Sequence, residues 1–364
     1  MESVTVKLSS GIFTKLSLEN MLKDGSSLIE FLSFLDISDV EECVFQKYYK
    51  RTPQYSVGGM LRLAAAYYFH KDKGYVKTIK SLTETDIKIL KFKKSPSPQE
   101  LQDFIHNRMG ENGFIEIMKL IAPKLNKLAE QKGTDYLSHD STPNEAGRYD
   151  KYADFNKHYK CNMYKSHITM KGTIPLLLTF SRGNANDSPY LKPHADMLNE
   201  FKITGKFMNL DGQYDSYKNY ALVKHIIGAY PYMTMRENAI INKTGKIDEI
   251  NRWCNKLWKF GGNPNNPIGT KLDFLFKHDR IKQAGAYYRN NNLENGMPKE
   301  EIDLRKRQEW THDHIKTTVK FDVRNRQNLK KSLHIIAAFI SYQLLVLTAL
   351  QNELNPNEFG FIKR

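Results

Sequence analysis

The chain has 364 residues, of which 40% are hydrophobic and 12% aromatic, which excludes a disordered chain and allows a sizeable core in one large domain or two ordinary ones. Lys and Arg number 55 against 40 Asp and Glu, a formal charge of +15. This excess favours a polyanionic partner, nucleic acid first and an anionic membrane second.

The three cysteines, Cys43, Cys161 and Cys254, lie far apart and form no CxxC pair. We therefore expect neither a disulfide framework nor a structural zinc site, and the pattern suits a reducing cytoplasm. The first residues, MESVTV, lack the basic start and apolar core of a signal peptide. Residues 335–350 are apolar but shorter than a usual membrane span, so we interpret them as a buried core helix and expect no membrane partner.

Residues 1–132 are expected to form an all-helical N-terminal domain, because apolar residues recur at helical spacing from Leu16 onwards. Ser97 and Glu100 form a capping box with Pro98 between them, which predicts a helix over residues 97–108. The basic run KILKFKK precedes it, so this helix could dock on DNA in helix-turn-helix fashion. The alternative is a solvated charged turn in a helical bundle.

Residues 133–354 show a different pattern, with strand-like runs at residues 134–142, 161–170, 174–181, 207–215 and 229–236. Helices are expected over residues 187–201 and from a cap at Asp215 to residue 227. Three strands in succession, then strands alternating with helices, predict an α/β domain with a five-stranded mixed sheet flanked by helices. The Asn- and Gly-rich residues 238–297 are interpreted as a loop-rich insertion.

Three acidic residues are candidates for a shared metal site. Asp140 and Asp211 stand at the ends of predicted strands, and Glu309 lies on a late helix that begins after Pro298. Carboxylates that meet at one edge of a sheet supply the hard oxygen ligands that Mg²⁺ or Mn²⁺ prefers. Two such ions, about 3.5–4 Å apart, can activate the attacking oxygen and stabilise the leaving one in phosphodiester cleavage.

Each carboxylate also has a simpler interpretation. Asp140 before Ser-Thr-Pro could cap a turn, and Asp211 before Gly could be a turn residue. Glu309 could be a solvated helix residue, with Glu300 and Glu301 as rivals for its role.

Arg305, Glu309 and Lys316 are four and seven residues apart, so they fall on nearly one face of the late helix. A carboxylate flanked by two cations on one face suits a metal ion and the phosphates beside it. The alternative is an i,i+4 ion-pair ladder on a solvated helix.

This pattern resembles the insertion-sequence transposases that have an RNase H-like catalytic domain and a Tyr-Arg-Glu-Lys signature, Y-x2-R-x3-E-x6-K. Arg305, Glu309 and Lys316 match its last three positions, whereas Ile302 replaces the tyrosine. Asp140 in DSTP is similar to the first-strand aspartate of the family, and the LDGQYDS segment is similar to the second. Residues 163–167, MYKSH, resemble a Gly-Tyr-Lys-Leu-His segment of the second strand, with Met in place of Gly.

The resemblance covers roughly residues 133–350 and implies a DNA transposase. Water activated by Mg²⁺ or Mn²⁺, as two ions, would hydrolyse a strand at the element's end, and the freed 3′-hydroxyl would attack the complementary strand or target DNA. The resemblance implies that Asp140, Asp211 and Glu309 are the catalytic and metal-binding residues, and that Arg305, Lys316, Lys165 and His167 contact DNA. It further implies double-stranded DNA as partner, a homodimer on that DNA, and a prokaryotic, nucleoid-associated cytoplasmic location.

Two basic runs fit a DNA-facing surface, or only a solvated one. Residues 155–186 contain no acid, and residues 320–331 contain five basic residues and one acid. Two other functions stay open: a nuclease of the same fold that does not transpose DNA, and a DNA-binding protein derived from a transposase.

Overall fold

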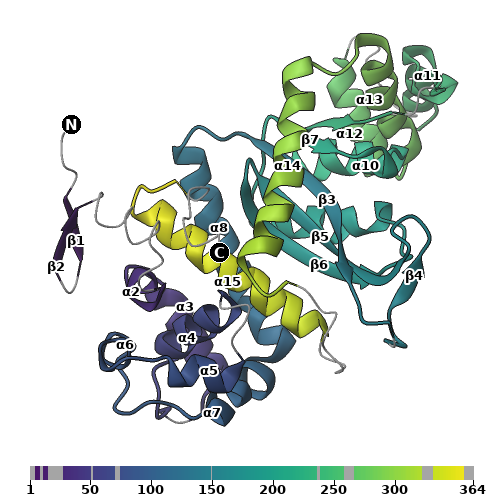
Figure 1. The fold of residues 1–364 in the computed structure, drawn as a ribbon. Helices are drawn as coiled ribbons and strands as arrows, with labels where there is room; N and C mark the ends of the chain where they lie inside the picture. The colour runs from purple at the N-terminus through teal and green to yellow at the C-terminus, as the bar shows by residue number, and fades with distance from the viewer. Residues whose placement is uncertain are drawn as a thin grey trace. The chain divides into compact units, whose positions relative to one another are not determined.

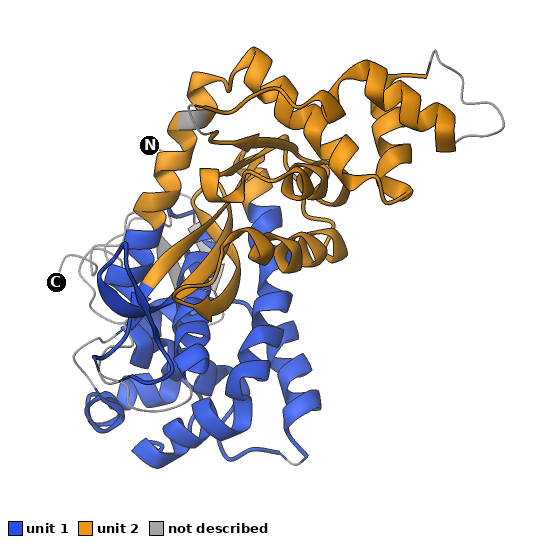
Figure 2. Cartoon of the chain, turned by 90° about the vertical axis from the view of Figure 1, so that its right-hand side faces the viewer, with its two compact units in different colours: residues 1–128, 144–164, 312–364 blue, residues 129–143, 165–311 orange. Residues whose placement is uncertain are grey.

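The computed structural model describes residues 5–8, 11–14, 28–50, 52–69, 74–148, 150–235, 238–257, 266–321 and 331–355. The chain divides into two compact units, coloured blue and orange in Figure 2. Unit 1 contains residues 1–128, 144–164 and 312–364, and unit 2 contains residues 129–143 and 165–311. Each unit combines segments that are distant in sequence, and the domain boundary at residue 132 stays a prediction.

Between residues 28 and 131 every described element is helical (Figure 1). These elements are α2 (Leu28–Ser33), α3 (Ser38–Tyr48), α4 (Val57–Phe69), α5 (Tyr75–Lys80), α6 (Glu84–Ile89), α7 (Pro98–Asp103), the π-helical segment η1 (Phe104–Met109) and α8 (Gly110–Gln131). Before them, β1 (Thr5–Leu8) pairs antiparallel with β2 (Gly11–Thr14), a hairpin that the sequence pattern did not predict.

The predicted capping box at the start of α7 is confirmed. The Ser97 side chain accepts a hydrogen bond from the Glu100 backbone N–H, and the Glu100 side chain accepts one from the Ser97 backbone N–H. Pro98 occupies the first helical turn, where its missing N–H costs nothing. The helical path then continues through η1 to Met109, which is close to the predicted end at residue 108.

The last helix, α15 (Lys331–Gln351), has the length and apolar composition of a membrane span, but its entire apolar window is buried in the structure. It packs against α4 and α2 within unit 1. This burial fits the interpretation of residues 335–350 as a core helix.

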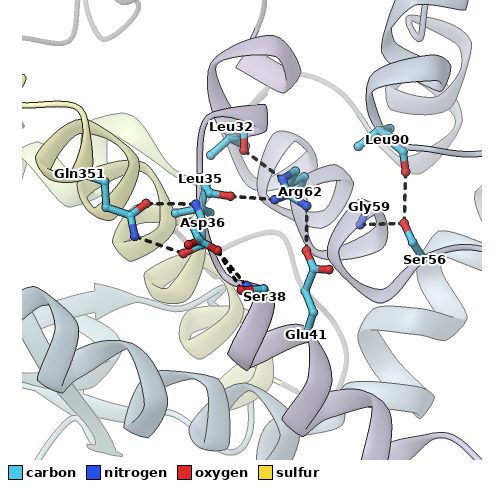
Figure 3. A network of polar contacts seen from close by, with 10 residues as sticks. All are labelled: Leu32, Leu35, Asp36, Ser38, Glu41, Ser56, Gly59, Arg62, Leu90 and Gln351. Atoms are coloured by element: carbon cyan, nitrogen blue, oxygen red, sulfur yellow. Dashed lines mark hydrogen bonds and ion pairs between the residues drawn. The ribbon is translucent and has the colours of Figure 1, made fainter. Parts of the chain in front are cut away.

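Arg62 on α4 ties the helices of unit 1 together (Figure 3). Its guanidinium donates to the carbonyl oxygens of Leu32 and Leu35 at 2.9 and 2.8 Å, and to Glu41 at 2.9 Å. Leu32 O also accepts a hydrogen bond from the Leu35 backbone N–H at 3.3 Å. The arginine thus adds donors to carbonyl oxygens at and just after the end of α2, where the helical hydrogen-bond pattern stops.

A six-stranded mixed sheet forms the other main feature, which confirms the predicted RNase H-like α/β fold class. The strand order is β4-β5-β3-β7-β8, with β6 pairing with β5. All five predicted strands are present, as β3 (Tyr136–Glu145), β5 (Cys161–Lys171), β6 (Ile174–Arg182), β7 (Phe207–Leu210) and β8 (Tyr230–Met233), and the additional strand is β4 (Asp154–Asn156). β3, β7 and β8 run parallel, and β4 pairs antiparallel with β5.

The helices of unit 2 follow the predicted alternation with two differences. They are α9 (Leu191–Glu200), α10 (Tyr217–Leu222) with its π-helical extension η4 (Val223–Ile227), α11 (Ile247–Leu257), α12 (Ile268–Lys277), α13 (Ile281–Asn295) and the first part of α14 (Lys299–Thr318), with short 3-10 turns η2 (Ser188–Tyr190), η3 (Gly212–Tyr214) and η5 (Lys243–Gly245). Residues of α14 from His312 onwards belong to unit 1. The segment interpreted as a loop-rich insertion is therefore mostly helical where it is described. The cap of α10 is Ser216, not Asp215.

Candidate catalytic site

The register of two parallel strands brings Asp140 and Asp211 together. In the β3–β7 pair, His139 lies opposite Leu210, and the next residue along each strand is an aspartate. β7 ends at Leu210, whereas β3 continues to Glu145, so the prediction that Asp140 ends its strand is wrong. Residues that follow an aligned pair of parallel strands stay neighbours, so Asp140 and Asp211 lie side by side at the edge of the sheet where β7 ends, and the negative charge of Asp211 acts on Asp140.

Helix α14 carries Arg305 and Glu309 to this edge. Arg305 Nη1 donates to Asp211 Oδ1 at 2.8 Å and to Thr234 Oγ1, just beyond the end of β8, at 2.7 Å. Its Nη2 lies 3.7 Å from Glu309 Oε1. One guanidinium therefore bridges the end of β7, the end of β8 and the glutamate on the helix.

The carboxyl group of Asp140 is electrostatically perturbed. Burial raises its pKa to about 7, and the negative charges of Asp211 and Asp187 act in the same direction. The Ser141 backbone N–H, which donates to Asp140 Oδ1 at 2.8 Å, and the Arg305 charge act against the rise. A buried carboxylate beside like charges is stabilised by an added cation.

Asp187 is a further acidic residue of the site that sequence reasoning missed. It is buried and accepts hydrogen bonds from Ser141 Oγ at 2.9 Å and from Lys165 Nζ at 2.8 Å. It thereby holds the residue that follows Asp140. The only sequence signal was its place before the predicted helix, where an aspartate is ordinarily a cap.

A layer of buried aromatic and histidine side chains lies behind Asp140. The His139 ring packs edge-on against His194 and Tyr214, with centroid distances of 4.6 and 5.1 Å. Burial lowers the pKa of His194 to about 3 and raises that of Tyr214, which the Asp140, Asp187 and Asp211 charges raise further. His194 is therefore neutral at physiological pH, and the buried rings form a low-dielectric wall for the carboxylates.

The structure places the proposed DNA-contacting residues of β5 in the interior. Lys165 Nζ also donates to the Ala185 carbonyl oxygen at 3.0 Å, which completes its buried pairing with Asp187. His167 is fully buried, bonds to Ser181 Oγ at 2.8 Å and stacks on Tyr190. In this conformation neither side chain faces outward, and their DNA contact stays a prediction.

Two signature positions are left, Lys316 and Ile302, and the structure describes the side chain of Lys316 alone. Lys316 lies on α14 in unit 1, where burial lowers its pKa and the charges of Asp313 and Glu145 oppose that effect. The side chain of Ile302 lies outside the described residues. The tyrosine position of the signature therefore stays without a structural test.

The three predicted carboxylates do not form a ready-made metal cage. Among the described residues, no group of three or more His, Cys, Asp or Glu side chains is arranged to hold a metal ion. Glu309 has a side chain that is 64% exposed, and Arg305 lies between it and Asp211. The Asp140–Asp211 pair fits a divalent cation in donor type and charge, and Glu309 would join it once Arg305 moves away.

A polar cavity adjoins the turn that follows Asp211, within unit 2. Its volume is about 870 Å³, and Gly212 and Gln213, directly after Asp211, form part of its wall. Arg289 and Asp215, paired through two hydrogen bonds of 2.8 and 3.1 Å, form another part. The remaining wall consists of amide and hydroxyl side chains, two exposed isoleucines, one alanine and one lysine: Asn186, Ser188, Ser216, Tyr217, Asn238, Asn242, Ile240, Ile241, Ala239 and Lys243.

The two basic runs are only partly at the surface. In residues 155–186, Lys157, Lys160 and Arg182 are exposed, whereas Lys165 and Lys171 are buried. Lys171 donates to Glu130 at 2.7 Å and to the Thr204 carbonyl oxygen at 2.8 Å. In residues 320–331, residues 322–330 lie outside the described part of the chain, and Lys320 and Lys331 are buried.

Comparison with known proteins adds little to this geometry. No protein-family model matches the chain, and no curated protein matches it. A solved structure, a piggyBac transposase synaptic complex with hairpin DNA, aligns with 99% of this chain and 81% of its own at 9% identity and a TM-score of 0.34. A similarity that low carries no conclusion about the function of this chain.

Proposed function

We propose that the chain is a DNA transposase that hydrolyses phosphodiester bonds at the ends of a mobile element and joins the freed 3′-hydroxyl to target DNA. The observation that carries the proposal is the side-by-side placement of Asp140, within β3, and Asp211, directly after the end of β7, with Arg305 and Glu309 of α14 at the same edge. The charge of +15 supports a nucleic-acid partner.

Asp140, Asp211 and Glu309 would hold Mg²⁺ or Mn²⁺. Bound there, two ions would activate the attacking oxygen and stabilise the leaving one. Arg305 would exchange Asp211 for a phosphate of the scissile strand, because its planar fork suits phosphate as well as carboxylate. The polar cavity beside Asp211 offers amide and hydroxyl donors to the same strand. Lys316 would contact a phosphate further along.

The test uses the whole chain and DNA from both sides of its coding region, where a transposase gene is expected to be flanked by inverted repeats. Asp140→Asn, Asp211→Asn and Glu309→Gln should each abolish cleavage in Mg²⁺ or Mn²⁺ while DNA binding stays largely intact. Glu300→Gln, an exposed rival on the same helix, is the matched control and should cleave normally. Cleavage by Asp211→Asn, or binding lost together with cleavage in all three variants, would overturn the assignment.

Strand transfer separates transposition from simple cutting. A pre-cleaved end with a 3′-hydroxyl should join target DNA in the presence of the wild-type protein, and two ends should be held by a homodimer. Cleavage without joining would identify a nuclease of the same fold. An Asp211→Ala variant that keeps the full biological effect would identify a DNA-binding protein whose carboxylates are not used.

A further inference from the structure

The segment between β3 and β5 exposes three large aromatic side chains. Phe155 is 54% exposed, Tyr152 49% and Tyr159 48%. We call residues 150–160 the aromatic tip; it belongs to unit 1, whereas the carboxylate site belongs to unit 2. Single exposed apolar residues are common on proteins, but three within eight positions mark an interaction surface.

The aromatic tip is also basic. Lys151, Lys157 and Lys160 are exposed beside the rings, and the Lys151 ammonium lies 5.3 Å from the centre of the Tyr152 ring. Of its two acids, Asp150 is buried and paired with Lys331. The exposed charge is therefore positive and suits an anionic partner.

Local hydrogen bonds hold the aromatic tip in shape. β4 pairs with the start of β5, with Phe155 opposite Asn162. Asn156 Oδ1 accepts hydrogen bonds from the backbone N–H groups of His158 and Tyr159 at 2.9 and 3.2 Å, which fixes the connecting turn. Asp150 Oδ1 accepts one from the Tyr152 N–H at 3.1 Å. A preformed surface loses less entropy when it binds.

We infer that the aromatic tip binds single-stranded nucleic acid, with unpaired bases stacked on Phe155, Tyr152 or Tyr159 and phosphates beside the lysines. Exposed rings interleaved with cations form the usual platform for unpaired bases, whose faces are available for stacking. In a duplex those faces are covered by neighbouring base pairs. This assignment does not depend on whether the carboxylates of unit 2 cut DNA.

The test compares two labelled oligonucleotides of equal length and charge, an eight-nucleotide single strand and an abasic strand without bases. Wild-type protein should prefer the strand with bases. In the triple variant Tyr152→Ala/Phe155→Ala/Tyr159→Ala, this preference should fall by at least about 5-fold. Stacking of one base on one ring raises the binding affinity by a factor of about 5 to 150. Phe45→Ala, which removes an exposed ring elsewhere in unit 1, should change nothing.

Charge and stacking are separated by a second variant. The variant Lys157→Ala/Lys160→Ala should weaken the binding of both oligonucleotides equally. It should also reduce the slope of the logarithm of the binding constant against the logarithm of the salt concentration by about 1.4 for single strands. Unchanged base preference in the aromatic variant overturns the inference. The inference is also overturned if the aromatic variant loses binding to phosphatidylserine vesicles but keeps its base preference. That result would assign the surface to membranes. Asp211→Asn should keep the base preference even where cleavage is lost.

Discussion

Arg305 donates a hydrogen bond of 2.8 Å to the carboxylate of Asp211, one of the two aspartates at the sheet edge. The same guanidinium lies 3.7 Å from Glu309. Its positive charge thus balances part of the negative charge that a divalent cation would otherwise neutralise. A divalent cation bound at this edge would therefore compete with the arginine for Asp211, and the proposed contact of Arg305 with DNA requires that Asp211 take another partner.

Removing Arg305 should accordingly strengthen cation binding in the absence of DNA. The Arg305 and Asp211 side chains are about one-third exposed, so their pair is worth about 0.2–1 kcal/mol. Arg305→Ala should raise the apparent affinity for Mn²⁺ by up to about 5-fold in calorimetric titrations. Arg305→Lys keeps the charge and should show a smaller rise. A fall in Mn²⁺ affinity would mean that Arg305 orients Asp211 for the metal instead of competing with it.

The raised pKa of Asp140 predicts a pH-dependent stability. Burial, its largest cause, raises this pKa from 3.8 to about 7. The protonated carboxyl therefore contributes stability that is fully present below about pH 4 and is lost as the pH rises through about 7. Asp140→Asn should match the wild type at pH 4 and exceed it at pH 8, by at most about 4 kcal/mol at about 1.4 kcal/mol per pH unit.

Urea unfolding of chelator-treated protein at the two pH values measures this difference. Asp196→Asn changes an exposed aspartate that pairs with Lys192 on the same helix. As a control it should stay within about 0.5 kcal/mol at both pH values. An Asp140→Asn variant less stable than wild type at pH 8 would show that the carboxylate is well solvated or compensated.

Much of the fold was predictable because its signals are local. The strands that carry Asp140 and lead to Asp211 alternate or run apolar over short stretches, and the capping box at Ser97 depends on residues three apart. The helices of residues 238–297 were missed because the Asn- and Gly-rich runs GGNPNNP and YYRNNNLENG in this stretch favour loops. Their buried Asn290 and Asn292 side chains bond to backbone carbonyls far away in sequence.

The candidate site was predictable only in part, for the same reason. The Arg305–Glu309 spacing is local, and the structure shows the resulting contact. The pairing of Asp187 with Lys165 and Ser141 joins residues 22 and 46 positions apart. The periodic spacing of residues along the sequence does not indicate contacts between residues this far apart. Burial of Lys165 likewise depends on tertiary packing, so a basic residue in a basic run gave no sign of it.

The Lys165–Asp187 pair should be a large contributor to stability. Both side chains are nearly inaccessible, and removing one partner of a buried pair typically costs about 3–5 kcal/mol because the other charge is left uncompensated. Lys165→Met and Asp187→Asn should each be destabilised on that scale in urea unfolding, and the double variant should recover part of the loss. Lys192→Met, in an exposed pair with Asp196, should cost under about 1 kcal/mol.

The same variants test whether Lys165 contacts DNA. With Lys165 held in the interior, Lys165→Met should leave the salt dependence of DNA binding unchanged under conditions where the variant is folded. A salt slope reduced by about one phosphate contact would instead show that Lys165 leaves Asp187 when DNA binds.

The contact of α13 with α10 should be sensitive to a single methyl group. A Cβ at Gly285 would lie 1.8 Å from the carbonyl oxygen of Tyr217, and α10 is the helix that follows the Asp211 turn. Gly285→Ala should therefore destabilise the protein by about 1–3 kcal/mol. It should also lower cleavage, because the helices can accommodate the methyl group only by moving apart.

A Cβ at Gly269 on α12 would meet open space. Gly269→Ala should therefore stabilise the protein by about 0.4–1 kcal/mol. Thermal unfolding of the two variants side by side measures the contrast, and equal melting temperatures would show that α13 does not pack on α10 this closely.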